Sequence, residues 1–235
     1  MPTSRLIEWQ IDDKTFEGFL ALPSGGPKGA VLICHAWGGR QAHEEEFAER
    51  LAGLGYAAMA GDVYGKGVRG STNEENQALM TPFIEDRPLL MVHLKASLDA
   101  LAAQPEVDSE RLAAAGFCFG GLAVLDLARA NAPVRGVTAF HALVGKGGDA
   151  GEPIKPKVLA LQGFDDPMSG PDDLKAFGVE MTERSADWQL VSYGGVSHAF
   201  TNAEANQPEN GMKFDAQARQ RAYQAFDNFL AELFD

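Results

Sequence analysis

The sequence predicts an α/β fold, with a mostly parallel central sheet, helices on both faces and an antiparallel hairpin at the N-terminus. Three observations predict it. Short apolar runs alternate with helical segments along most of the chain. The run GAVLICHA at 29–36 is apolar almost throughout, as in a strand buried on both faces. The first segment instead holds two alternating runs, RLIEWQI and TFEGFLALP, separated by an Asp-Asp-Lys turn typical of a hairpin.

The remaining elements follow in order. The stretch 43–55 places Phe47, Leu51 and Leu54 on one helical face and has an acidic first turn, which favours a helix that Gly55 ends. Alternation of apolar runs and helical patterns then predicts a strand at 56–64, a Gly-rich loop at 65–71, a helix at 74–103 that Pro82 and Pro88 could break, a strand at 111–117, a helix at 119–130, strands at 134–140 and 155–163, a helix at 171–183, a strand at 188–193 and a helix at 215–233. We interpret 145–156 as a surface loop.

Composition limits the class of protein. A chain of 235 residues with 45% apolar content fits one globular domain spanning 1–235. The formal net charge of -13 makes nucleic acid and anionic membrane poor partners. No leader-like apolar region and no apolar stretch of about 18 residues is found, so we expect a cytoplasmic protein that does not enter the membrane. Cys34 and Cys118 lie inside apolar runs, and we expect both to be reduced.

Cys118 occupies the centre of Gly116-Phe117-Cys118-Phe119-Gly120, which has GxSxG spacing with cysteine in place of serine. This spacing is typical of a sharp strand-to-helix turn that holds a nucleophile above a sheet, with glycines where the backbone approaches closely. The N–H of Phe119 at the helix start would then face an oxyanion, and the helix dipole would favour a thiolate. The alternative is a small buried cysteine in a Gly-rich turn.

Two further side chains follow strands in the chain order that such a nucleophile needs. Asp166 ends the turn after the strand at 155–163, and His198 follows a Gly-Gly loop after the strand at 188–193. We prefer Asp166 to Asp165 because it holds the fourth position of the Gly163-Phe164-Asp165-Asp166 turn. Singly, either aspartate could terminate a turn and His198 could be a surface histidine. Together they predict a Cys118–Asp166–His198 triad.

The second oxyanion donor should come from the loop after the strand at 29–36, and the N–H of Trp37 is our candidate. Its indole could wall a pocket or be ordinary core. His35 is expected to bond the backbone of that loop. His43, His93 and His141 are expected at a helix start, a helix face and a strand end, without a catalytic constellation. The crowded HAWGGRQAHEEE stretch is better explained by helix-capping carboxylates than by a metal site.

The stretches GFCFGG, GFDDP, GGVSHAFTN and LGYAAMAGDVYGKG resemble signatures of the dienelactone hydrolase family within the α/β-hydrolase superfamily, from about residue 15 to the C-terminal helix. The resemblance implies an α/β-hydrolase fold without a large lid, and hydrolysis of a small ester or lactone without metal or cofactor, by a carboxymethylenebutenolidase-like ester hydrolase acting as a monomer or homodimer. It maps Cys118, Asp166 and His198 onto the family triad, and Phe119 and Trp37 onto its oxyanion donors.

The sequence departs from the family at one position. Well-studied members carry a glutamate after the residue matching His35, whereas this chain has Ala36, so we expect an ion pair with His198 to activate Cys118 instead. Glu44 to Glu46 could substitute only if the helix start bent inward, which we do not expect. The family's arginine contacts to a substrate carboxylate suggest Arg87, with Arg40 and Arg69 as weaker candidates, although a solvated salt bridge explains Arg87 as well.

Two alternatives to the hydrolase remain open from the sequence. A thioesterase or other acyltransferase would use the same triad on a different substrate. A noncatalytic binding protein or a thiol redox sensor would keep the pocket without turnover. Acylation of Cys118 by an activated ester, as against peroxide oxidation without acylation, would separate the hydrolase from the sensor.

Overall fold

The computed structural model describes residues 2–145 and 151–235. The chain divides into two compact units, Met1–Ala115 and Gly116–Asp235, which are described in turn. Part of the expected surface loop at 145–156, residues 146–150, lies outside the described residues. The expected single domain stays a prediction.

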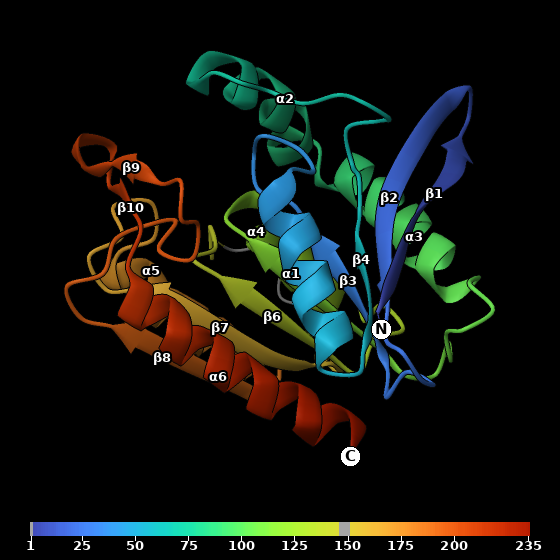
Figure 1. Cartoon of the computed structure of the whole chain (residues 1–235). Coiled ribbons are helices and arrows are strands. Elements are labelled where there is room, and N and C mark those ends of the chain that lie inside the picture. The colour runs from blue at the N-terminus through green and yellow to red at the C-terminus, as the bar shows by residue number, and fades with distance from the viewer. Residues whose placement is uncertain (1, 146–150) are drawn as a thin grey trace. The chain divides into compact units, whose positions relative to one another are not determined.

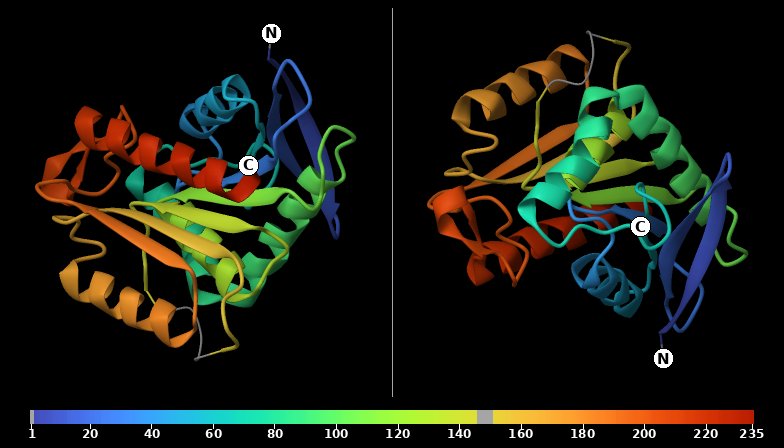
Figure 2. Two further views of the ribbon diagram at one scale, coloured as in Figure 1. Left: turned by 90° about the horizontal axis from the view of Figure 1, so that it is seen from below. Right: turned by 90° about the horizontal axis from the view of Figure 1, so that it is seen from above.

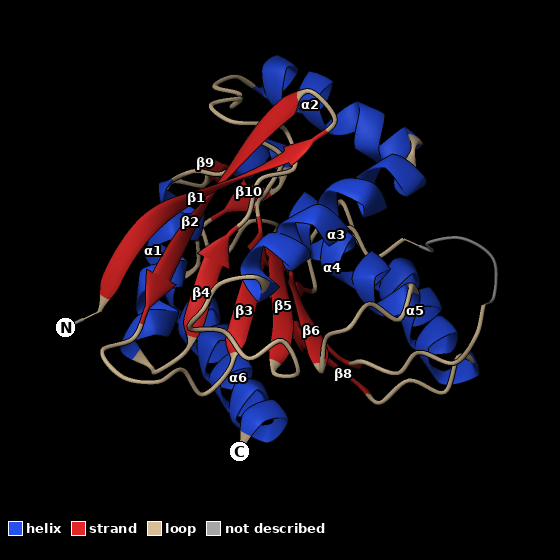
Figure 3. Cartoon of the chain, turned by 90° about the vertical axis from the view of Figure 1, so that its right-hand side faces the viewer, coloured by secondary structure: helices blue, strands red, loops and turns tan. Residues whose placement is uncertain are grey.

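The first unit contains a four-stranded arrangement in the order β1-β2-β4-β3. Strands β1 (Thr3–Ile11) and β2 (Lys14–Leu22) form the predicted antiparallel hairpin, visible in Figure 3. Strands β3 (Ala30–Cys34) and β4 (Ala57–Ala60) are parallel and buried along their whole lengths, which explains their uninterrupted apolar sequences. Strand β4 joins the hairpin by pairing antiparallel with β2.

Three helices accompany these strands. Helix α1 (Ala42–Gly53) packs on β4 and β2, and α3 (Arg87–Ala102) packs on β1 and β3; Figure 1 shows them on opposite sides of the strands. The expected long helix is two helices, because α2 (Asn73–Glu85) ends before Asp86. The Asp86 carboxylate accepts a hydrogen bond from Leu89 N at 2.9 Å and so caps α3. Of the two prolines, Pro88 marks the break, while Pro82 lies inside α2.

The second unit holds three parallel strands, β6 (Gly136–Phe140), β7 (Lys157–Gly163) and β8 (Trp188–Tyr193). Strand β5 (Leu112–Phe117) leads into it and is followed at once by α4 (Phe119–Arg129). Helices α5 (Pro171–Glu183) and α6 (Ala216–Phe234) lie on opposite sides of β7 and β8 in Figure 2. The sequence did not predict the small hairpin of β9 (Asn206–Gln207), the 3-10 turn Pro208–Asn210 and β10 (Met212–Lys213).

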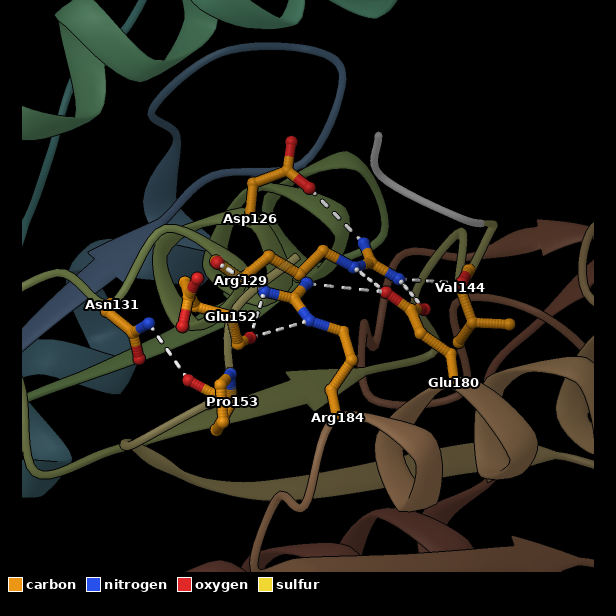
Figure 4. A network of polar contacts seen from close by, with 8 residues as sticks. All are labelled: Asp126, Arg129, Asn131, Val144, Glu152, Pro153, Glu180 and Arg184. Atoms are coloured by element: carbon orange, nitrogen blue, oxygen red, sulfur yellow. Dashed lines mark hydrogen bonds and ion pairs between the residues drawn. The ribbon is translucent and has the colours of Figure 1, made fainter. Parts of the chain in front are cut away.

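A buried polar network joins α4 to α5 (Figure 4). The Arg129 guanidinium donates to both carboxylate oxygens of Glu180, at 2.9 and 2.7 Å, and to Asp126 at 3.2 Å. Arg184 donates to the carbonyl oxygens of Arg129 and Glu152, both at 2.9 Å. The two arginines balance the two carboxylates, so the network holds little net charge in a region where an unpaired charge would be costly.

The predicted fold class is therefore confirmed: a mostly parallel α/β architecture with an antiparallel N-terminal hairpin. Within the described residues, none of the helices combines the length and the apolar character that a membrane span requires.

Candidate active site

Cys118 stands between β5 and α4 with a strained backbone, φ 55° and ψ -114°. Few residues other than glycine adopt a positive φ, and such strain is found mainly at functional sites. The close turn explains the glycine at 116, because a Cβ there would lie 2.0 Å from the carbonyl oxygen of Gly120. Cys118 N donates to Phe140 O at 3.0 Å, which ties the turn to the end of β6. Every residue of α4 is buried, whereas Cys118 is partly exposed.

Asp166 follows β7 and is 1% exposed. One carboxylate oxygen accepts a hydrogen bond from Met168 N at 2.8 Å, and the other accepts one from His198 Nδ1 at 2.7 Å. Asp165, the alternative weighed from the sequence, is exposed and donates its N–H to Val196 O instead. The geometry therefore favours Asp166 as the partner of the histidine.

His198 is 1% exposed and its backbone is held on both sides. Its N–H donates to Gly211 O at 2.9 Å, and its carbonyl accepts from Lys213 N at 3.0 Å. The segment that includes β10 thus clamps His198, a contact between residues that no local sequence pattern connects. Among the described residues, Nε2 of His198 is buried and meets no hydrogen-bond partner within ordinary geometry.

The electrostatics couple His198 to Cys118. Burial is the largest influence and lowers the pKa of His198, but the charge of Cys118 and the hydrogen bond to Asp166 outweigh it and raise this pKa to about 10. The imidazole of His198 therefore holds its proton more tightly than an ordinary histidine does. Burial alone raises the pKa of Cys34 to about 12, which leaves that thiol protonated and unreactive.

Asp166 and His198 are joined by a hydrogen bond, and Cys118, in the same unit, raises the pKa of His198; the triad of the three residues stays a prediction. Phe119 begins α4 and is fully buried. Trp37 and Arg87 belong to the first unit, so their convergence on the same site stays a prediction. Arg87 is half-buried at the start of α3.

The loop that carries Trp37 is itself well ordered by contacts. The carbonyl oxygen of Trp37 accepts a hydrogen bond from Tyr64 Oη at 3.0 Å, whereas the N–H of Trp37 has no acceptor among the described residues. His35 bonds the backbone as expected, with Nδ1 2.7 Å from Ala36 O and Nε2 accepting from Val63 N at 3.2 Å. An N–H oriented by its neighbours but not used by them is available to an oxyanion.

Two residues weighed from the sequence, Glu44 and Arg40, have surroundings that the sequence did not predict. Glu44 does point inward, contrary to expectation: it is 2% exposed and accepts hydrogen bonds from Ala36 N and Gln41 N. Its only sequence signal is its third position in the helix, which is typical of a capping box. Arg40 is 3% exposed and paired with Glu17 and Glu45, so its charge is already compensated.

Comparisons with known proteins agree with the fold. Residues 16–234 match the model of the dienelactone hydrolase family. An uncharacterized protein of Caenorhabditis elegans is 35% identical over 62% of this chain and 94% of its own length. A dienelactone hydrolase-like promiscuous phosphotriesterase, P91, from metagenomic libraries is 34% identical with a TM-score of 0.93, over 100% of this chain and 99% of that one. A dienelactone hydrolase from Anabaena variabilis shares the fold, with a TM-score of 0.68 at 22% identity over 98% of both chains.

Proposed function

The chain is a hydrolase that belongs to the dienelactone hydrolase family, and we propose that it cleaves small esters or lactones with Cys118 as nucleophile, His198 as acid and base, and Asp166 as the orienting carboxylate. The observation that carries the proposal is the hydrogen bond of 2.7 Å between His198 Nδ1 and Asp166, and the raised pKa of His198 agrees with it. A strained, partly exposed cysteine opposite such a histidine has the features of an activated nucleophile.

In the first half of the reaction, the Cys118 thiolate attacks the ester carbonyl and forms a C–S bond, and the carbonyl oxygen takes the negative charge. The N–H groups of Phe119 and Trp37 are the proposed donors to this oxyanion. When the tetrahedral intermediate collapses, the C–O bond breaks and the His198 imidazolium gives its proton to the leaving alkoxide. The product is an acyl thioester on Cys118 and a neutral imidazole.

In the second half, neutral His198 removes a proton from water, and the hydroxide attacks the thioester carbonyl. The C–S bond then breaks, which restores the thiolate and the imidazolium and releases the carboxylic acid. Asp166 orients the ring throughout by its hydrogen bond to Nδ1. A thiolate is a good nucleophile but also a good leaving group, so activated esters and lactones suit it better than amides.

The test is rapid-quench intact-mass spectrometry with p-nitrophenyl acetate and a small enol lactone. The wild-type chain should form an acyl adduct on Cys118 that decays at the rate of turnover, while Cys118→Ser keeps the fold and loses most activity. His198→Ala should abolish acylation at pH 7. Full activity in His198→Ala, or turnover by a Cys118→Ala variant, would remove the proposed mechanism. Peroxide oxidation of Cys118 without any acyl adduct would favour the redox sensor, and preference for acyl thioesters would favour the thioesterase.

The similarity to P91 supports a second candidate activity, hydrolysis of phosphotriesters. Cys118 would attack phosphorus, and His198 would protonate the departing aryloxide before water releases the phosphoryl group. An aryl dialkyl phosphate supplied to the wild-type chain and to Cys118→Ala separates the outcomes. Cys118-dependent release of more than one equivalent of phenol supports turnover, whereas a single equivalent with a stable phosphoryl adduct marks the compound as an inhibitor only.

A further inference from the structure

His141 has a strained backbone and lies beside the candidate site. It directly follows β6 in the chain, is 2% exposed and has a φ of 36°. A buried non-glycine residue in this region of backbone space is strained, and the surrounding structure must sustain that strain. The sequence predicted only a strand end here.

The side chain of His141 contacts three residues of the segment that carries His198, namely His198, Phe200 and Thr201. Its ring packs edge-on against the His198 ring, with centroids 5.1 Å apart and planes 67° apart. Its Nε2 shares a hydrogen bond of 2.7 Å with Oγ1 of Thr201, a residue that is fully buried. The turn between His198 and Thr201 includes Ala199, whose φ of 57° is also unfavourable for a non-glycine residue.

Hydrogen bonds hold the backbone around His141 in place. His141 N donates to Leu161 O at 2.8 Å, which ties it to β7. At Ala142, the next residue, the Gln162 amide makes two hydrogen bonds, accepting from the N–H at 2.6 Å and donating to the carbonyl at 2.9 Å. Gln162 is fully buried, so these bonds are shielded from water. The imidazole of His141 therefore projects from an anchored strand end.

We propose that His141 is a positioning residue that, through its ring contact and its bond to Thr201, holds the His198 ring with Nε2 toward the Cys118 sulfur. Asp166 fixes only Nδ1, so it leaves the ring free to pivot about that hydrogen bond. The edge-on contact from His141 blocks this pivot, and the Thr201 bond fixes the turn that carries the ring. The expected effect on catalysis rests on the proposed use of Cys118 and His198 in hydrolysis. The placement of the His198 ring by His141 does not depend on that function.

The variants are chosen to separate packing from the hydrogen bond. His141→Phe keeps an aromatic ring of similar size and loses the bond, and Thr201→Val loses the same bond from the other side. Thr201→Ser keeps the hydroxyl and should behave as wild type. A displacement of about 1 Å can lower catalytic rates by about a hundredfold, so a partly freed ring should lower kcat about tenfold with little change in KM. His141→Phe and Thr201→Val remove the same hydrogen bond. The double variant should therefore be no slower than the slower of the two single variants.

The second readout needs no substrate: the rate at which iodoacetamide alkylates Cys118 as a function of pH. The groups shown to act on His198 are Cys118, Asp166 and the His141 ring. If the sulfur and the imidazolium form an ion pair, as proposed, alkylation of the wild type should stay nearly constant from pH 6.5 to 9. In His141→Phe and Thr201→Val, the ratio of the rate at pH 6.5 to that at pH 9 should fall about tenfold.

His93→Phe is the matched control. His93 also makes one ring hydrogen bond, to Val63 O at 2.7 Å, and edge-on contacts with Phe16 and Phe83, but it touches none of the proposed catalytic residues. It should leave kcat and the alkylation profile unchanged. Thermal unfolding of each variant identifies any that fails to fold, in which case the Thr201 pair decides.

The outcomes are distinct for the two proposals. If folded His141→Phe and Thr201→Val alkylate with the wild-type pH profile and retain kcat, the bond between His141 and Thr201 does not position His198 and the proposal fails, although the proposed hydrolysis can still stand. If they change the alkylation profile in a chain that hydrolyses no ester, the positional claim holds and the proposed function fails.

Discussion

The sharpest stability prediction concerns Glu44→Gln. The Glu44 carboxylate is 2% exposed and accepts hydrogen bonds from Ala36 N at 3.2 Å and Gln41 N at 3.0 Å. Burial, the largest influence, raises its pKa from the ordinary 4.5 to about 7, against the lowering effect of those N–H groups, and the neighbouring Glu45 adds to the rise. The folded protein therefore binds a proton more tightly at Glu44 than the unfolded chain does.

The sign and size follow from linkage. Because the folded pKa is the higher one, the stabilising contribution is fully present below pH 4.5 and is lost as pH rises through about 7. Each pH unit between the two values corresponds to about 1.4 kcal/mol, so the complete loss is about 3 kcal/mol. Glutamine cannot ionise, so the variant escapes this loss, although it can accept a hydrogen bond only through its single carbonyl oxygen.

The measurement is urea unfolding of wild type and Glu44→Gln at pH 5 and pH 8.5. Titration of all other groups cancels in the difference between the two proteins. This difference should shift in favour of the variant by about 2 to 3 kcal/mol at the higher pH. Glu46→Gln, exposed on the same helix, should show no such shift. A difference that is equal at both pH values would refute the argument, because Glu44 would then be ionised or neutral in both states alike.

Three further predictions concern the second unit and the free thiols. Arg129→Met should destabilise by about 3 to 5 kcal/mol because Glu180 is left charged and buried, and Arg129→Met/Glu180→Met should recover part of this in urea unfolding; additive effects would contradict pairing. Cys118→Gly should unfold at a higher temperature than Cys118→Ala, because glycine relieves about 1 to 3 kcal/mol of backbone strain at this position. Equal unfolding temperatures would mean that the φ of 55° is not strained. Iodoacetamide at pH 8 should label Cys118 and spare Cys34, whose thiol pKa of about 12 keeps it protonated; peptide mass mapping that finds both labelled would contradict its burial.

The fold was predictable from the sequence because its main signals are local. A continuous apolar run identified β3 as a strand buried along its length, the alternation of strands and helices identified β4, and alternating residues identified the N-terminal hairpin. The two prolines did not show whether the long helix breaks at Pro82 or at Pro88. The cap by Asp86 places the break next to Pro88. The short β9 and β10 were missed because two-residue strands carry no periodicity.

The candidate triad could be located by its order along the chain and by its strand ends, since parallel strands present their carboxyl ends at one edge. The choice of Asp166 over Asp165 rested on turn position, and the hydrogen bond to His198 agrees with it. By contrast, nothing in the local sequence distinguishes His141 from a routine strand-end histidine. Its partner Thr201 lies 60 residues away, so only the folded chain brings the two together.

Contacts that local sequence does not reveal also explain why the burial of the Glu44 side chain was not predicted. A glutamate in the acidic first turn of a helix is normally a solvated cap, and two more acidic residues follow it. What turns Glu44 inward is the backbone of the loop before the helix, whose Ala36 N–H and Gln41 N–H would otherwise lack an acceptor. Unmet backbone donors in a Gly-rich loop therefore draw a carboxylate inward against its desolvation penalty, and that competition sets its pKa near 7, close enough to neutrality for pH to act on it.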